Sequence, residues 1–459
     1  MSEPTEKKVS RRKFLKYAVA GGAVVVVGGA AYYLSQTSSP ATTPTSSATS
    51  TLTSSLTPTN IIVWSNHEED SLRQAYVTTA QAFMSSTDST VTALAVPTVD
   101  FPTKFAAALA ANSIPDIITP SADLVKAYMA KGLFEPLDDV ISQYGASNLY
   151  ENPTNDFSYQ GVHYGIDFFN DVCGLTYRKD LLQAASVNVP TTWDQLLDAA
   201  KALTNTSGQY GFGFASGNFP VANWGLYTFM RTNNADIFDE SGNQIFDSSE
   251  TTETFEFMRQ LAPYWPAESK GWSWTDCKRA SYSGLLALDW YEPIAVLKDS
   301  ITYSTPAISA TIGAGLTPIH TTNFTYMEET GLCVPKGGQS GNLALTKQLI
   351  LNYMKPENAV QFSSGNAPID YNPALIPVQN LTQYWSDPKI SAYAGLFKQV
   401  IPLQANGGCF ARALPQATPV LSNNILATAL QRVLWTNDSI SSIISDTDSA
   451  IKSAVATVS

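Results

Sequence analysis

The chain has 459 residues, of which 44% are hydrophobic and 14% charged, and its formal net charge is −12. This composition can bury a large core, which excludes a wholly disordered chain, and the length predicts two folded lobes plus a tail. An acidic body lacks the basic face that nucleic acids require and is repelled by anionic lipid, so we expect neither as a partner.

The N-terminal segment differs from the rest of the chain. Residues 10–16, Ser-Arg-Arg-Lys-Phe-Leu-Lys, resemble a twin-arginine export signal, and residues 17–34 carry no charge. An uncharged run of this length suits a segment that enters the bilayer. Because no A-x-A motif ends this run, we predict that residues 1–34 remain as a membrane anchor. Residues 35–59, almost wholly Ser, Thr, Pro and Ala, predict an extended stalk.

Sequons and cysteines agree with a body that lies outside the cytoplasm. The sequence predicts N-glycosylation at four Asn-x-Ser/Thr sites, which are Asn205, Asn323, Asn380 and Asn437. The four cysteines are Cys173, Cys277, Cys333 and Cys409. None forms a CxxC pair, so we expect no structural zinc site and no metal. An oxidising compartment would allow two disulfides, and three full pairings as well as free buried thiols stay open.

Short apolar segments alternate with amphipathic helices from residue 60 onward. Strands are predicted at residues 61–64, 91–96 and 116–118, and helices at residues 72–83 and 105–111. This alternation predicts an α/β fold with a parallel sheet covered on both faces. Ligands of such sheets bind at the carboxyl ends of the strands.

A second α/β stretch begins near Gly174. Thr192 and Gln195 form a predicted capping box at the start of an amphipathic helix. The chain ends in two helices, with Leu421 and Ile425 on the first and residues 440–451 on the second.

Five segments in order resemble the family 1 extracellular solute-binding proteins, the maltose-binding-like group. The most specific is Pro190-Thr-Thr-Trp-Asp-Gln-Leu196, which is similar to that family's P-x-T-W-x-E-L signature. The other four segments are residues 60–68, 107–118, 132–139 and 164–182. The chain departs from the family pattern at Asp167, where the family usually has Pro, at Glu328–Gly331, and at Leu286–Glu292.

The resemblance implies two α/β lobes with a hinge that the chain crosses more than once, and a ligand held in the cleft between them. Lobe one is expected to hold residues 60–167 and 303–368, and lobe two residues 168–302 and 369–459. The resemblance also implies a carbohydrate ligand, an ABC permease as the membrane partner, a monomeric body and no cofactor.

Sugar recognition needs planar polar groups for the hydroxyls and an aromatic platform for the ring. We predict ligand contact, partly from strand ends and partly from the resemblance, for Asn66, His67, Glu68, Asp123, Asp171, Trp224, Asp289, Trp290 and Arg412. Trp290 is the first choice for the platform, and Trp272 and Trp274 are weaker candidates. Trp64, Trp193 and Trp435 are predicted core residues.

The sequence does not predict an enzyme. The polar cluster at residues 67–70 lacks HExxH spacing, and the carboxylate pairs at residues 138–139 and 328–329 are chain neighbours, which do not face each other. A GxSxG motif, a P-loop and a GxGxxG motif are absent from the sequence. A peptide or other polar-solute binder, and a secreted glycosidase, remain as alternatives.

Overall fold

The computed structural model describes residues 58–456 except 68, 206 and 365–370. The predicted anchor and nearly all of the predicted stalk therefore lie outside the described residues. Within these limits, no helix has both the length and the apolar character needed to cross a membrane.

One lobe is built around a seven-stranded sheet with the order β12-β6-β11-β3-β1-β2, in which β13 also pairs with β11. Its strands are β1 (Asn60–Ser65), β2 (Thr90–Ala95), β3 (Ile117–Thr119), β6 (Gly165–Val172), β11 (Thr325–Cys333), β12 (Asn372–Pro373) and β13 (Gly407–Gly408). The helices on this side are α2 (Asp70–Ser85), α3 (Phe101–Ala111), α4 (Ala122–Ala130), α5 (Asp138–Tyr144), α6 (Glu151–Asp156), α14 (Leu343–Met354), α15 (Pro356–Ala359) and α16 (Ile376–Gln379), beside a small hairpin of β4 (Ser158–Tyr159) and β5 (Val162–His163).

The other lobe is built around a four-stranded sheet with the order β10-β7-β9-β8. Its strands are β7 (Gly174–Arg178), β8 (Tyr210–Gly213), β9 (Leu286–Tyr291) and β10 (Ile312–Gly315). Its helices are α7 (Lys179–Ala185), α8 (Trp193–Leu203), α9 (Pro220–Thr232), α10 (Ser249–Leu261), α11 (Trp274–Ser283), α12 (Pro293–Tyr303), α13 (Pro306–Ser309), α21 (Ile425–Trp435) and α22 (Ile440–Val455).

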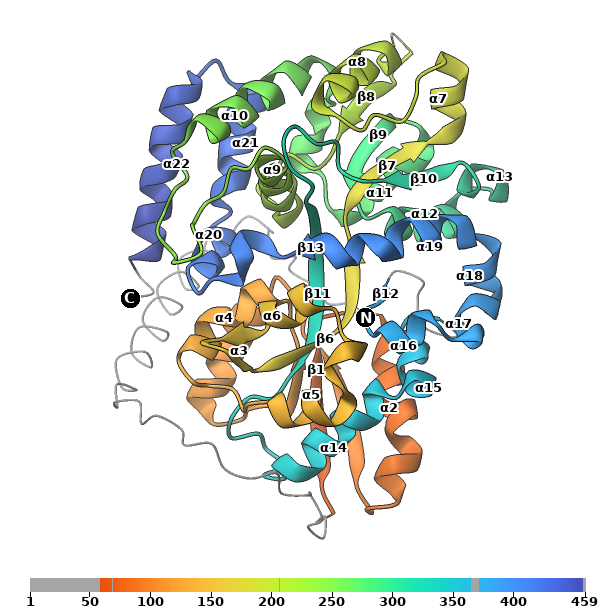
Figure 1. Cartoon of the computed structure of the whole chain (residues 1–459), viewed down its shortest axis with the longest axis vertical. Coiled ribbons are helices and arrows are strands. Elements are labelled where there is room, and N and C mark those ends of the chain that lie inside the picture. Colours follow the sequence, from red (N-terminus) through yellow and green to blue (C-terminus); the bar gives the residue numbers. More distant parts are fainter. Residues whose placement is uncertain (1–57, 68, 206, 365–370, 457–459) are drawn as a thin grey trace, which may run out of the picture.

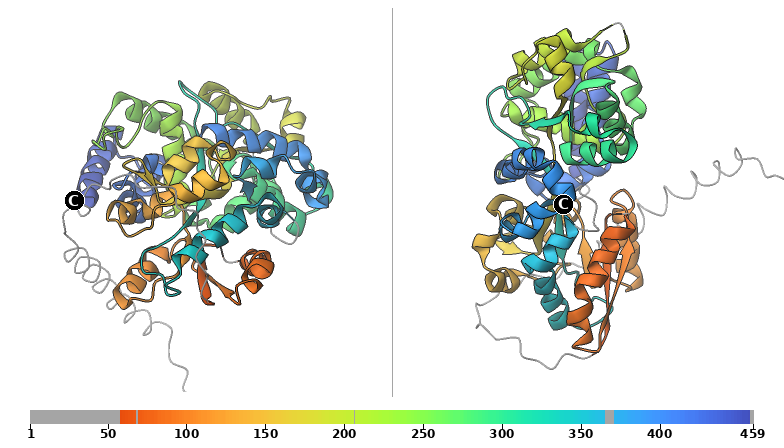
Figure 2. Two further views of the ribbon diagram at one scale, coloured as in Figure 1. Left: turned by 60° about the horizontal axis from the view of Figure 1, so that its bottom comes forward. Right: turned by 90° about the vertical axis from the view of Figure 1, so that its right-hand side faces the viewer.

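A band of short helices lies between the two lobes (Figures 1 and 2). It comprises α17 (Thr382–Ser386), α18 (Pro388–Ala392), α19 (Ala394–Val400), α20 (Ala417–Ser422) and the 3₁₀ turns η5 (Ile401–Asn406) and η6 (Phe410–Ala413). Helix α19 packs on β10 of the second lobe, and α20 packs on α4 of the first lobe. The band is therefore a connection between the lobes.

The structure confirms the predicted alternation of strands and helices at the start of the body. β1 pairs in parallel with both β2 and β3, as expected for strands joined by α2 and α3. The Thr192 hydroxyl accepts a hydrogen bond from the backbone of Gln195 and caps α8, although the Gln195 side chain reaches the backbone of Thr191 rather than that of Thr192. The sheet is mixed, because β11 runs antiparallel to β3 and β6.

The predicted lobe boundaries do not coincide with the ends of the sheets. Strand β6 continues past residue 167 to Val172, because its whole length pairs with β11. Residues 312–315, expected in lobe one, form β10 and pair with β7 in the second sheet. The chain passes between the sheets at Cys173 and again over residues 316–324, and the band of short helices forms a third connection.

Candidate ligand-binding cleft

A cleft of about 350 Å³ lies where the two lobes face each other. The first lobe contributes residues that follow β1 and β2 together with side chains from β6 and β11, while the second contributes α11 and the end of β9. The lining residues are Asn66, His67, Glu69, Pro97, Thr98, Val99, Asp171, Trp274, Thr275, Lys278, Tyr291, Glu292, Ala295, Glu328 and Tyr371. The cleft thus lies at the carboxyl ends of the parallel strands, as predicted.

A second cavity of about 240 Å³ adjoins the first and shares Thr98 and Val99 with it. Its wall includes Ser121 from the loop after β3, and Phe219 and Trp224 from the start of α9. The two cavities together form a site that extends along the boundary between the lobes.

Asn66 and His67 follow β1, and packing holds both side chains in place. The Thr119 hydroxyl donates to Asn66 Oδ1 at 3.1 Å, and the Asn66 amide nitrogen Nδ2 has no hydrogen-bond partner among the described residues. His67 lies 2.8 Å from the Tyr371 hydroxyl and 3.2 Å from the Thr330 hydroxyl. Burial lowers the pKa of His67 to about 4, so its imidazole is neutral at physiological pH.

Carboxyl groups form much of the cleft floor. Glu328 and Asp171 are directly opposite each other on the antiparallel pair β11 and β6, and Glu292 follows β9. Burial, together with nearby Asp123 and Glu292, raises the pKa of Glu328 well above its usual range. Asp123 does not line either cavity; burial raises its pKa to about 6, while the Ser121 hydroxyl donates to it at 2.7 Å. Such groups are suited to hydrogen bonding with hydroxyls of a ligand.

Aromatic rings form the wall that the second lobe contributes. Trp274, which is partly buried, lines the cleft and stacks on Trp224 at a centroid distance of 5.3 Å and an interplanar angle of 26°. Trp224 in turn stacks on Tyr326 at 5.1 Å. The Trp224 indole nitrogen Nε1 is buried and has no hydrogen-bond partner in the described part of the chain. The stacking on Trp224 therefore holds the Trp274 ring in place at the cleft wall, where a sugar ring could stack on it.

Three of the predicted ligand residues lie elsewhere in the structure. Trp290 is 0% exposed and donates from Nε1 to the Thr317 hydroxyl at 3.1 Å, within the core of the second lobe. Successive side chains of a strand point to opposite faces, so Tyr291 reaches the cleft and Trp290 does not. Asp289, also buried, is hydrogen-bonded to Ser281, and burial raises its pKa to about 8. Of the two tryptophans, Trp274 lines the cleft and Trp290 does not.

Arg412, predicted to reach the ligand, instead makes an ion pair with buried Asp236 at 2.8 Å. Neither cavity, as the described residues define it, includes Arg412. Trp272 is buried, and Trp193 stacks on Phe257 at 4.3 Å as a core residue.

The remaining predictions divide between the cleft and its surroundings. Asn66, His67 and Asp171 line the first cavity and Trp224 lines the second, whereas Asp123 is buried beneath them. Glu68 lies outside the described residues. The sequence analysis missed the lining residues Lys278, Tyr291, Glu292, Glu328 and Tyr371. The signal for Glu328 was available, since two adjacent glutamates stand in β11 and glutamate is almost never fully buried unless it is paired.

The cysteines do not pair. Cys173, Cys277, Cys333 and Cys409, all within the described part of the chain, are buried free thiols. The sequence left open three disulfide pairings as well as free buried thiols, and the structure has the free thiols.

The chain belongs to the bacterial extracellular solute-binding protein family, whose model matches residues 78–392. Members of this family are transport components that bind a solute without converting it, in agreement with the prediction that the chain is not an enzyme. The family resemblance stated from the five sequence segments is thereby confirmed.

Two curated proteins and one solved structure show which relatives the chain is similar to. It is 25% identical to Escherichia coli YcjN, assigned to the periplasmic-binding proteins of ABC transporters, over 44% of this chain and 49% of YcjN. It is 28% identical to the mannitol-binding protein of Pseudomonas aeruginosa over 34% of this chain and 38% of that protein. The matched region thus spans about half or less of these curated relatives.

The fold is that of solved two-lobed solute-binding proteins. A solute-binding protein of an ABC transporter from Thermotoga lettingae, bound with α-D-tagatose, superimposes with a TM-score of 0.73 at 18% identity. The superposition covers 86% of this chain and 100% of that chain. This confirms the predicted α/β two-lobed fold.

Proposed function

We propose that this protein binds a sugar or a sugar alcohol in the cleft between its lobes and delivers it to the permease of an ABC transporter. The observation that carries the proposal is the position of Trp274, which faces a floor of carboxyl groups across the cleft. A ring platform on one side and hydroxyl acceptors on the other are the two requirements of sugar recognition.

The relatives support the same class of ligand. The Pseudomonas aeruginosa protein is named for mannitol, and the Thermotoga lettingae structure holds tagatose. The adjoining second cavity offers room beyond the first ring, and Trp224 Nε1 in its wall is a buried donor suited to a further hydroxyl. An elongated, hydroxyl-rich solute fits this arrangement better than a compact one.

The alternatives make different demands on the same cleft. A peptide would need partners for its backbone N–H and C=O groups. A glycosidase would need two carboxyl groups on opposite sides of a sugar ring; Asp171 and Glu328 lie side by side on one sheet, and Glu292 comes from the other lobe. Sugar binding is favoured over a glycosidase because the family binds solutes without converting them, and over peptide binding because the relatives are named for mannitol or bound with tagatose.

A panel of ligands tests the proposal. The purified protein is to be incubated with mannitol, tagatose, maltose, a neutral peptide and no ligand, followed by thermal unfolding and product analysis. A polyol or sugar should raise the melting temperature, because ligand that binds only the folded state stabilises it. A response to the peptide alone, or the appearance of cleaved sugar, would refute the proposed ligand class or the binding role.

We further propose that the body lies outside the cytoplasm, held by residues 17–34 through the stalk at residues 35–59. All four sequon asparagines are exposed, which is required of glycosylated sites. We also propose that the body divides into two lobes, between which the chain passes near Cys173 and over residues 316–324. The body is further proposed to be monomeric.

Export and anchoring have separate tests. Changing Arg11 and Arg12 to Lys should retain the protein in the cytoplasm, and normal export of this variant would exclude the twin-arginine assignment. Protein released into the medium with its N-terminus after residue 34 would exclude the anchor while leaving export intact.

A further inference from the structure

Three potential metal ligands from distant parts of the chain meet beside the third connection between the lobes. They are Asp156 at the end of α6, Glu329 in β11, and Cys409 between β13 and η6. One ligand atom from each lies within 4.8 Å of the other two. The backbone N–H of Cys409 donates to Asp156 Oδ2 at 3.3 Å, which holds the thiol next to the carboxyl groups.

Glu329 is the second, independent sign of a ligand at this position. Its side chain is 0% exposed, and among the described residues neither carboxyl oxygen has a hydrogen-bond partner. Buried polar groups are almost always satisfied, so an unpartnered carboxyl group needs an explanation. Buried charged groups are paired or coordinate a metal, so Glu329 and the adjacent Asp156 call for a compensating cation or a shared proton.

Lys126 is the nearest basic group, and it does not fill this role. Its ammonium donates to the backbone carbonyl oxygen of Asp156 at 2.6 Å rather than to a carboxyl oxygen. With a divalent cation bound, the positive charges of the ion and of Lys126 together balance the three anionic ligands. The buried cluster would then be electrically neutral, as a buried cluster should be.

We propose that Asp156, Glu329 and Cys409 form a binding site for a divalent cation of the Zn²⁺ type. A thiolate ligand selects Zn²⁺ or Cd²⁺ over Ca²⁺ and Mg²⁺, which prefer cages of oxygen ligands. Three protein ligands leave the fourth tetrahedral position for a water molecule. The proposal is independent of which solute occupies the cleft.

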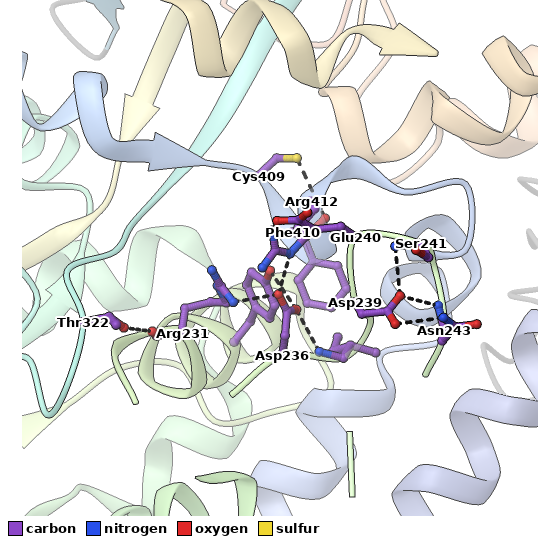
Figure 3. A network of polar contacts seen from close by, with 12 residues as sticks. Arg231, Asp236, Asp239, Glu240, Ser241, Asn243, Thr322, Cys409, Phe410 and Arg412 are labelled. Carbon is purple, nitrogen blue, oxygen red and sulfur yellow. Dashed lines mark hydrogen bonds and ion pairs between the residues drawn. The ribbon is translucent and has the colours of Figure 1, made fainter. Parts of the chain in front are cut away.

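A cation at this site would stabilise the strained backbone of the third connection between the lobes. Ala411, Arg412 and Ala413 directly follow the ligand Cys409 and its neighbour, and all three have positive φ values, between 43° and 57°. Such backbone persists only where contacts on both sides enforce it. Figure 3 shows one side, where Arg412 and Arg231 converge on Asp236 of the second lobe. The cation would hold the other side to the first lobe through Glu329 and Asp156.

Titration of the full-length, chelator-treated protein with ZnCl₂ tests the site directly. We expect one equivalent to bind in calorimetry and to raise the melting temperature, and we expect CdCl₂ to produce the ultraviolet absorption of a cadmium–thiolate bond. MgCl₂ and CaCl₂ should have no such effect. If Zn²⁺ does not bind at one equivalent, the proposal is wrong, and the carboxyl pair is a structural cluster that shares a proton.

Matched variants locate the binding. Cys409→Ser and Glu329→Gln should each weaken Zn²⁺ binding by at least roughly 10- to 100-fold, the range found when even outer-shell partners are lost. Cys277→Ser is the control, because Cys277 is an equally buried free thiol in the second lobe. Equal loss of the cadmium–thiolate signal in Cys277→Ser, or its survival in Cys409→Ser, would overturn the assignment. The titration of the unaltered protein decides the question if a variant does not fold.

Discussion

Trp274 and Trp290 are two tryptophans of one lobe with different surroundings. Trp274 lines the cleft and is partly buried, so its removal should act mainly on the ligand. Stacking of a sugar on a large aromatic side chain contributes on the order of 1–3 kcal/mol. We therefore expect Trp274→Ala to weaken sugar binding roughly 5- to 150-fold. Isothermal titration measures the affinity, and the melting temperature without ligand should fall less than in Trp290→Ala, because Trp274 is only partly buried.

Trp290→Ala is the matched comparison. Its ring is fully buried against Phe214, so removing it should lower the free energy of unfolding by about 3–5 kcal/mol. The folded fraction should still bind sugar. If Trp290→Ala lost affinity while keeping its melting temperature, the platform would be Trp290 and our cleft would be misplaced.

Asp289 predicts a pH dependence of stability. Its pKa in the folded state is about 8 because of burial, far above the usual 3.8. Between about pH 4 and pH 8 the folded protein therefore keeps a proton that the unfolded chain has lost, and stability must fall as pH rises through this window. Asp289→Asn stays neutral, so we expect a smaller loss of melting temperature between pH 5 and pH 8 than in the parent.

The comparison needs a control, since Asp167 also has a pKa of about 8. Its ionisation lowers stability as pH rises in the same way as that of Asp289. The parent should therefore lose stability more steeply than Asp289→Asn, and the variant should retain part of the slope. A substitution at an exposed carboxylate, such as Asp198→Asn, should leave the slope unchanged. Identical slopes in the parent and Asp289→Asn would show that Asp289 is ionised in the folded protein.

At the scale of elements, local sequence patterns predicted the helices and strands whose formation depends mainly on nearby residues. β1, α2, β2 and α3 follow from apolar periodicity, and the start of α8 follows from Thr192 as its cap. The antiparallel pairing of β6 with β11 joins segments more than 150 residues apart in sequence, and no local pattern specifies such a partner. The predicted lobe boundaries differ from the observed ones for the same reason. β10 belongs to the second sheet because it pairs with β7, and the local sequence does not specify this partner.

The η6 turn depends on one buried ion cluster. Asp236 accepts hydrogen bonds from Arg231 at 2.7 Å and from Arg412 at 2.8 Å, and its side chain is 2% exposed. Asp236→Ala would leave two partly solvated arginines, 19% and 37% exposed, without their shared carboxylate, so it should cost up to about 3 kcal/mol of unfolding free energy. Chemical denaturation measures this.

The exposed pair of Lys104 and Asp100 provides a control of the same chemistry. Ion pairs in water contribute at most about 1 kcal/mol, so Asp100→Ala should be close to neutral. Equal effects of Asp100→Ala and Asp236→Ala would mean that the η6 segment does not depend on Asp236.

At the scale of the whole molecule, the sequence located one half of the cleft better than the other. Asn66 and His67 were found because they follow a strand that local pattern reveals. Trp290 was chosen from the family resemblance; that Tyr291 lines the cleft instead could not be predicted, because the alternation of side chains in a strand has no fixed phase until the sheet is known. The place of Trp274 could not be predicted, since only tertiary packing brings it into the same cleft as the residues that follow β1.

We expect the lobes to close on ligand about the connections between them, and Gly174 lies at the first connection, directly after Cys173. A Cβ atom at Gly174 would lie 2.6 Å from the carbonyl oxygen of Gly315, which ends β10 at the second connection. No side chain can move aside there, because the obstacle is backbone. Gly174→Ala should therefore push the two connections apart and reorient the lobes without altering any residue that lines the cleft.

The expected result for Gly174→Ala is weaker sugar binding, together with a smaller ligand-induced decrease in radius of gyration measured by small-angle X-ray scattering. Gly271→Ala is the control, because a Cβ atom at Gly271 meets nothing within 4 Å. Lobe closure is a rigid-body motion about a few connecting residues, so strain at a connection should reach the ligand only through the relative orientation of the lobes. Unchanged affinity and unchanged compaction in Gly174→Ala would mean that the lobes do not pivot at Gly174.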